Sequence, residues 1–205
     1  MPLDRERIVT EAVALLDESG LEMVTLRKLA ARLGVQAPTL YWHIKNKAAL
    51  VNAIAEAILH AEFAGLSGPP ESDSWQSWLT TMATRLRRAM LAHPDGARVV
   101  SAGQMSVTMA SVTEVSVRCL VDRGVSLRQA RLTVLAVERF TIGHVLEEQA
   151  PRPDADAVAD FDMEAFAATH PLLVAVITDY FRDGADVDAL FQDTLAVIIP
   201  PENGA

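Results

Sequence analysis

Apolar residues recur along most of this 205-residue chain at the three- and four-residue spacing of amphipathic helices. Before residue 64 the spacing predicts four helices. Asp4, Thr25 and Asn46 can cap the first, second and fourth of them, and Pro38 fits the first turn of a short third helix. Gly34 follows the second helix and can adopt the positive φ that a tight turn requires. The pattern therefore predicts helix, turn and short helix in close succession.

The apolar positions of the first three helices are spaced to form one small core. Ala30 carries a small side chain, which lets the second and third helices approach closely. The residues that we expect in this core are Ile8, Leu16, Leu29, Leu33, Val35 and Leu40.

A segment rich in glycine, proline and serine at 65–74 interrupts the helical pattern. Beyond it, helices are predicted from Trp75 to about residue 93 and at about 106–123, 126–149, 170–183 and 186–199. The acidic, proline-bearing segment 150–163 is predicted to be a mobile loop. No segment alternates for long with a period of two residues, and no long repeat is present, so the expected fold class is all-α.

Charge is distributed unevenly along the chain, whose net charge is −9. Residues 1–50 hold seven basic and six acidic residues, whereas the remainder holds eleven and twenty-one. Between residues 23 and 47 there are five basic side chains and no acidic one, and all three lysines of the chain lie there. A small basic surface on an acidic body indicates a protein that binds a polyanion with one end.

Several other classes of protein are not expected. No apolar run approaches the roughly 20 residues of a membrane span, and the charged N-terminal stretch does not resemble a secretory signal. A lone cysteine, Cys119, favours a core position in a protein of the reducing cytoplasm. Catalytic signatures, phosphate-binding loops and histidines at metal-ligand spacing are absent, so no catalytic residue, metal or cofactor is predicted. A helical module that binds only other proteins stays open as an alternative to a nucleic-acid-binding protein.

The stretch APTLYWHIKNK, residues 37–47, places three large side chains side by side at Tyr41, Trp42 and His43. Neighbouring residues of a helix point about 100° apart, so at least one of the aromatic rings must face outward. The rings could cover a small three-helix core or contact a ligand, and the acid-free basic stretch around them favours DNA. In a helix-turn-helix the second helix enters the major groove, and cationic side chains such as Lys47 bind phosphates. Arg27 can reach a guanine edge or a phosphate.

The segment TLRKLAARLGVQAPTLYWHIKNKAAL strongly resembles the DNA-binding domain of the tetracycline-repressor (TetR) family. The resemblance continues through SWQSWL, RRAMLAHPDGARV, DRGVSLRQA and FTIGHVLEEQ, and so covers most of the chain. It implies an all-α homodimer that binds palindromic double-stranded operator DNA and releases it when a small molecule binds. An activator, or a DNA-binding regulator without ligand control, is the alternative.

The resemblance also implies which residues contact the operator. These are Arg27, Pro38, Thr39, Tyr41, Trp42, His43 and Lys47. Leu26 and Ala37 stand where the tetracycline repressors carry a threonine and a glutamine that touch DNA. Because a glutamine amide can bind an adenine edge with two hydrogen bonds, its loss at Ala37 predicts a different operator sequence.

The effector implied by the resemblance is not a tetracycline–magnesium chelate. Phe63, Met82, Leu86 and Val100 stand where the tetracycline repressors use histidine, asparagine, phenylalanine and histidine, and Arg139 replaces a further histidine. Of the chelate-binding residues only Glu147 matches. We therefore expect a more apolar effector, with Arg139 and Glu147 as polar contacts or, alternatively, as an interface ion pair. The predicted effector site is Phe63, Met82, Leu86, Val100, Met105, Arg139 and Glu147.

The predicted organisation is a DNA-binding domain at 1–46, a connecting helix at 47–64 and a ligand-binding and dimerisation domain at 65–205. The connecting helix is expected to carry the effect of the ligand to the DNA-binding domain. Wide apolar faces predict that the helices at 126–149 and 186–199 form a four-helix bundle between two subunits. Alternatively, these faces are buried within their own subunit. Their apolar residues are Ala130, Val134, Val137, Leu146, Val187, Leu190, Phe191, Leu195 and Ile198.

Overall fold

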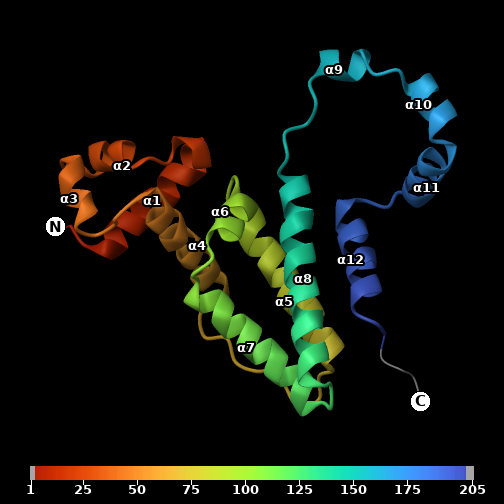
Figure 1. Cartoon of the computed structure of the whole chain (residues 1–205), viewed down its shortest axis with the longest axis horizontal. Helices are drawn as coiled ribbons and strands as arrows, with labels where there is room; N and C mark the ends of the chain where they lie inside the picture. The colour runs from red at the N-terminus through yellow and green to blue at the C-terminus, as the bar shows by residue number, and fades with distance from the viewer. Residues whose placement is uncertain (1–2, 202–205) are drawn as a thin grey trace.

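The computed structural model describes residues 3–201, and within them the chain folds into helices without a β-strand. The outermost parts of the predicted domains, residues 1–2 and 202–205, lie outside the described residues. Figure 1 shows a small N-terminal group of helices at one end, a body of longer helices, and a C-terminal arc on the other side. The predicted all-α fold class is confirmed.

The N-terminal group is built by the residues that the sequence pattern selected. It contains α1 (Arg5–Ser19), the 3₁₀-helix η1 (Leu21–Met23), α2 (Leu26–Leu33) and α3 (Ala37–Tyr41). The side chains of Asp4 and Thr25 accept hydrogen bonds from the first turns of α1 and α2, as predicted. Gly34 has φ 69° and ends α2 in the left-handed conformation. Ile8, Leu16, Leu29 and Leu40 are fully buried in the core that these helices share.

The helix α4 (Lys47–Phe63) belongs to two hydrophobic cores. Asn46 caps it by accepting a hydrogen bond from the backbone N–H of Ala49. Its residues from Leu50 to Ile58 pack in the N-terminal core, whereas Leu59 and Phe63 pack in the core of the body. A movement of this helix would therefore change the packing of both cores.

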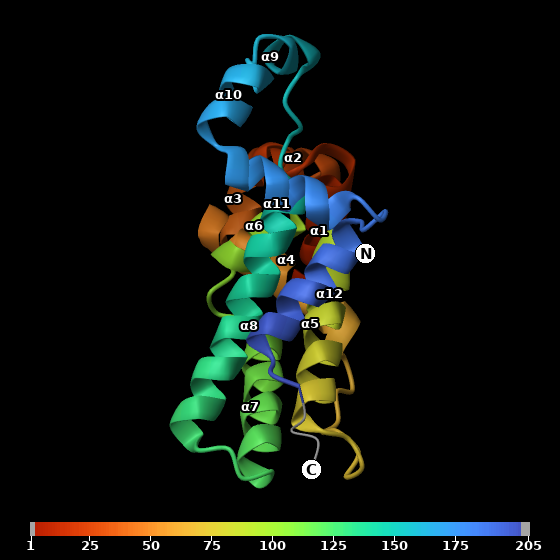
Figure 2. The same ribbon diagram turned by 90° about the vertical axis from the view of Figure 1, so that its right-hand side faces the viewer.

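The body consists of α5 (Trp75–Leu91), α6 (Gly96–Ala102), α7 (Val107–Asp122) and α8 (Leu127–Glu148). Figure 2 shows α5, α7 and α8 running alongside one another, with α6 near the N-terminal group. The short α6 lies against both α4 and α8. A Cβ atom on Gly103 would come within 2.3 Å of the Ala55 Cβ, so the chain after α6 packs tightly on α4.

After α8 the chain forms α9 (Ala155–Ala159), α10 (Met163–Thr169), α11 (Pro171–Phe181) and α12 (Val187–Ile198). In Figure 1 α9, α10 and α11 arch away from the body before α12 returns beside α8. The prediction of a continuous loop at 150–163 is wrong, because residues 155–159 form α9. Three short elements, η1, α6 and α10, were not predicted, since none is long enough to repeat an apolar spacing.

Much of the apolar surface that we assigned to a dimer interface is buried inside this chain. Ala130, Val134 and Val137 of α8 pack in the core of the body, as do Phe191 and Leu195 of α12. Other apolar residues of the same region are exposed in the single chain. They are Leu127, Leu132, Leu172, Leu173, Val176, Ile177, Phe181, Val187 and Val197.

Candidate DNA-binding surface and effector cavity

The three side chains at Tyr41, Trp42 and His43 all reach solvent. Trp42 is 89% exposed and Tyr41 52%, whereas the neighbouring Leu40 is fully buried. The short helix α3 begins at Ala37 with Pro38 in its first turn and ends at Tyr41, so Trp42 lies just beyond it. The prediction that the aromatic rings face outward is confirmed.

The four other residues predicted to contact DNA, Arg27, Pro38, Thr39 and Lys47, are exposed too. Arg27 lies in the first turn of α2, and Lys47 is the first residue of α4. All seven predicted residues therefore reach solvent in the folded chain. Their role in binding DNA stays a prediction.

Not every cation of the basic stretch is available to a ligand. The Arg32 Nε donates to Glu11 at 2.7 Å, and its two terminal nitrogens donate to Glu18. Both carboxylates lie on α1, so Arg32 ties α2 to α1. Arg32 is one of the five basic residues between 23 and 47, with Arg27 and Lys47. The sequence alone does not show which of these cations form ion pairs within the chain.

The N-terminal group is fastened to the body at the turn between α5 and α6. Asp95 accepts a hydrogen bond from the Leu21 backbone N–H at 2.9 Å, and this bond, ahead of the pairing with Arg98, lowers the pKa of its carboxyl although burial acts against it. Arg98 also pairs with Glu22 at 2.6 Å. Asp95 has φ 57°, so these contacts hold it in a conformation that is uncommon for residues other than glycine.

A second tie connects α4 to the start of α7. The Ser106 and Thr108 hydroxyls donate to the Glu56 carboxylate at 2.6 and 2.7 Å. Burial raises the pKa of Glu56, but these hydrogen bonds and those from the backbone outweigh it and hold the pKa below its ordinary value. Glu56 therefore fixes the chain between α6 and α7 to the middle of α4.

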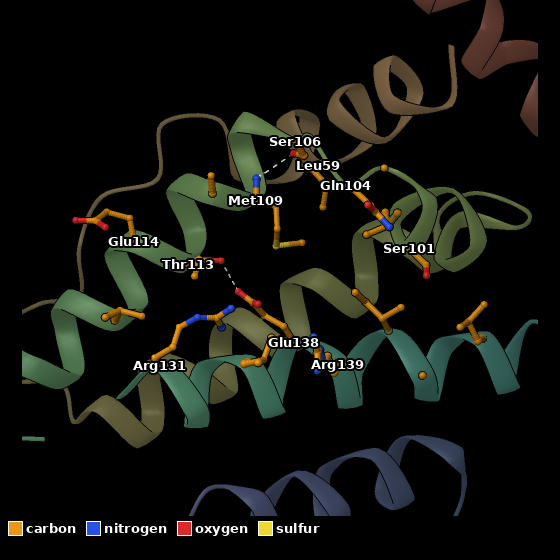
Figure 3. A pocket seen from close by; sticks show the side chains of 18 residues that line it. Leu59, Ser101, Gln104, Ser106, Met109, Thr113, Glu114, Arg131, Glu138 and Arg139 are labelled. Atoms are coloured by element: carbon orange, nitrogen blue, oxygen red, sulfur yellow. Dashed lines mark hydrogen bonds between the residues drawn. The ribbon is translucent and has the colours of Figure 1, made fainter. Parts of the chain in front are cut away.

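A cavity of about 880 Å³ lies between α4, α6, α7 and α8. One face of α8 lines it at intervals of three and four residues, from Arg131 through Leu135, Glu138 and Ile142 to Leu146. Met109 and Thr113 face them from α7, and Leu59 reaches the cavity from α4. Figure 3 shows the Thr113 hydroxyl bonded to the Glu138 carboxyl across the cavity.

Glu138 is the half-buried carboxyl of this cavity. Burial raises the pKa of Glu138, while the hydrogen bond from Thr113 and the charges of Arg131 and Arg139 act in the opposite direction. Glu138 and Met109 also line a small void of about 20 Å³ on the far side, together with Met82 and Leu86. These two side chains therefore stand between the large cavity and the apolar core.

The structure brings only two residues of the predicted effector site, Val100 and Arg139, to the large cavity. Phe63, Met82 and Leu86 are buried in the core behind it. Met105 is 81% exposed and lies at a groove between α1 and α4, and Glu147 is exposed and outside the cavity lining. The single pocket expected among Phe63, Met82, Leu86, Val100 and Met105 is thus divided over separate places.

Glu138 and its partner Thr113 were not singled out from the sequence. The signal that could have found Glu138 is the regular spacing of the α8 residues that line the cavity, in which a carboxyl stands among Leu135, Ile142 and Leu146. Among residues 3–201 no group of histidine, cysteine, aspartate or glutamate side chains is arranged to hold a metal ion. No helix in the same range is long and apolar enough to cross a membrane.

Comparisons with known proteins give matches to both parts of the chain. A family model described as bacterial regulatory proteins, tetR family, matches residues 8–54, and one described as tetracyclin repressor-like, C-terminal domain, matches residues 68–200. The tetracycline repressor protein class C of Escherichia coli is 39% identical over 197 residues, which are 96% of this chain and 89% of that protein.

Two solved structures are similar over nearly the whole chain. A TetR variant from Acinetobacter baumannii AYE in complex with minocycline has a TM-score of 0.73 and 32% identity, and the match covers 97% of this chain and 95% of that one. BioQ with its natural double-stranded DNA operator has a TM-score of 0.67 and 27% identity, with 96% and 99% covered. Both an operator-bound and a drug-bound protein therefore share this fold.

Proposed function

This chain belongs to the tetR family of bacterial regulatory proteins as a ligand-responsive DNA-binding repressor, and we propose that it binds a palindromic operator as a homodimer in the cytoplasm. A small, mainly apolar effector in the cavity between α4, α6, α7 and α8 releases the operator. We assign DNA binding to residues 1–46, and effector binding and dimerisation to residues 65–205. Residues 47–64 transmit the effect of the effector to the DNA-binding domain.

One observation carries this proposal, namely that α4 spans the two sites. Its first residue, Lys47, lies on the predicted DNA surface, and Leu59 lines the cavity. Twelve residues of α-helix separate them by about 18 Å. A change of shape at the cavity is therefore coupled to the position of the DNA-binding surface through a single rigid element.

The homodimer is supported by the exposed apolar residues of α8, α11 and α12. In α11 no side chain is buried, although Leu172, Val176 and Ile177 give it an apolar face. Apolar surface of this extent commonly marks a contact with another protein. A second copy of the chain, related by a two-fold axis, would cover this apolar surface. It would also supply a second DNA-binding domain for the other half of a palindromic operator.

The test uses the DNA that flanks the gene of this protein. Fluorescence anisotropy should show tighter binding of the full-length protein to that DNA than to random DNA of the same length, at a stated salt concentration. Release is then measured on the same complex against a panel of small molecules. Equal affinity for both DNAs would contradict operator recognition, and a reporter that is switched on by the protein would indicate an activator instead.

A further inference from the structure

Two arginines and two glutamates line the effector cavity, but in the part of the chain that the structure describes the arginines are not paired with the glutamates. Arg131 and Arg139 both line it, and neither guanidinium forms an ion pair or a hydrogen bond within residues 3–201. By contrast, Arg85, Arg87 and Arg88 of α5 are all paired with carboxylates. The two unpaired cations are eight residues apart on α8, and Arg131 lies beside Glu138 in Figure 3.

Neither acidic side chain of the cavity forms an ion pair with these arginines within the described residues. Glu114 is paired with Arg118 one turn along α7. The charges of both arginines act on Glu138, but in the same range it forms no ion pair with either of them, and one of its oxygens accepts the Thr113 hydroxyl. The cavity therefore offers two cations without ion-pair partners among residues 3–201, and apolar side chains from α6, α7 and α8 also line it.

We propose that the effector is an amphipathic organic anion, whose acidic group binds near Arg131 and Arg139 while its aromatic or aliphatic body lies against the apolar wall. This inference rests on the proposed role of the cavity as the effector site. Val100, Met109, Ile142 and Leu146 supply the apolar wall. Guanidinium groups bind carboxylates with two parallel hydrogen bonds, which gives the arginines an advantage over other donors for this ligand class.

The ligand class is tested with three probes that share one ring system: naphthalene-2-carboxylate, its neutral carboxamide and the cationic 2-naphthylmethylammonium. Binding to the full-length protein without DNA is measured by isothermal titration calorimetry near neutral pH. The carboxylate should bind about tenfold more tightly than the carboxamide, and the ammonium probe most weakly.

Variants locate the binding site of the carboxylate probe. Arg131→Gln and Arg139→Gln should each weaken carboxylate binding by about fivefold and leave carboxamide binding within about twofold. Arg128→Gln is the matched control, because Arg128 is exposed on the same helix but does not line the cavity, and it should change neither.

Glu138 gives an independent readout through pH. Burial raises the pKa of Glu138, and above that pKa its carboxylate repels the probe, so carboxylate affinity of the parent protein should fall as pH rises through the range in which Glu138 ionises. Glu138→Gln should remove this dependence. The charged groups that face Glu138 are Arg131 and Arg139 on α8 and Glu114 on α7, while α5 presents only apolar side chains there. The arginines keep their charge across this range.

Several outcomes would overturn the proposal. These are equal affinities for the three probes, preference for the ammonium probe, no binding of any probe at millimolar concentration, or equal effects of the Arg128 and Arg139 variants. Because these measurements contain no DNA, they are independent of operator binding. Failure of the protein to bind the flanking DNA would instead contradict the proposed function and leave the ligand class to be decided by calorimetry.

Discussion

At the scale of single residues, the predicted DNA-binding surface contains large side chains that are not part of the core. Trp42 exposes 89% of its surface, while Trp78 is buried and donates its indole N–H to Ser116 at 3.2 Å. A large ring kept in solvent gains little free energy of folding. We therefore expect the exposed Trp42 ring, like the neighbouring Tyr41, to contact another molecule.

Trp42→Ala should change the free energy of unfolding by less than about 0.5 kcal/mol and weaken operator binding on the order of tenfold. Trp78→Ala is the control for a buried indole and should cost about 3–5 kcal/mol of stability. Urea denaturation and DNA anisotropy measure the two effects separately. If Trp42→Ala destabilised the chain as much as Trp78→Ala, the exposed ring would have to be assigned to folding.

Arg27 and Lys47 are predicted to divide specificity and affinity between them. Arg27→Ala should cost about 1–3 kcal/mol of operator binding and relax the preference at one base pair. Lys47→Ala should weaken binding to all sequences and lower the salt slope by about one ion. Titrations on operator and random DNA at several salt concentrations distinguish the two, and identical behaviour of both variants would refute the assignment.

At the scale of elements, the tie between Glu56 and the start of α7 has a definite pH dependence. The Glu56 pKa lies below its ordinary value because hydrogen bonds from Ser106 and Thr108 outweigh burial. A carboxyl with a lowered folded-state pKa stabilises the folded chain above its unfolded-state pKa of about 4.3, and this contribution is lost as pH falls through the folded-state value.

Glu56→Gln should therefore lower the free energy of unfolding by about 1–3 kcal/mol at pH 7, since an amide cannot accept all the hydrogen bonds that the carboxylate accepts. The difference from the parent protein should shrink as pH falls below about 4. Denaturant titrations at both pH values measure it, with Glu71→Gln in the exposed segment at 65–74 as control. If the difference in free energy of unfolding between the parent protein and Glu56→Gln stayed constant down to pH 3, the Glu56 carboxylate would not be its cause.

The long helices could be predicted because each combines a cap with several turns of apolar spacing. Thr25 and Asn46 are examples, and α4 begins at Lys47 as expected. Short elements carry too few turns for such a pattern, and α6 depends on the unusual backbone of Asp95 and on contacts made by distant parts of the chain. The lining of the cavity was only partly predicted, since spacing shows that Met82 faces inward but not whether a cavity or a filled core lies there.

At the scale of the whole molecule, the exposed apolar residues of α8, α11 and α12 predict a dimer. Sedimentation at micromolar concentration should give about twice the chain mass of 22.2 kDa. Val197→Arg, at an α12 residue that is 84% exposed, should shift the protein toward the monomer, because an unpaired charge would be buried in the interface. Val121→Arg on α7 is the matched control. A parent protein that sediments as a monomer would contradict the prediction.

Release of the operator is expected to involve the DNA-binding domain, the connecting helix α4 and the body together. In a dimer the two copies of α3 must lie about 34–36 Å apart to enter successive major grooves. We expect the body to set that separation and α4 to transmit it, because Leu59 and Phe63 of α4 pack in the core beside the cavity. An effector that binds the DNA-incompetent arrangement tenfold more tightly lowers operator affinity by about 1.4 kcal/mol.

Filling the cavity should therefore separate induction from DNA binding. Val100→Trp places an indole in the cavity from α6, and Ala110→Trp does so from the exposed side of α7, where overpacking of the core is avoided. Both variants should abolish effector-induced release while ligand-free operator binding stays within about tenfold of the parent. Ala136→Trp, on α8 but outside the cavity, should leave induction intact. If Ala110→Trp released DNA at the same effector concentration as the parent, the effector would bind elsewhere and α4 would have to receive its signal from another site.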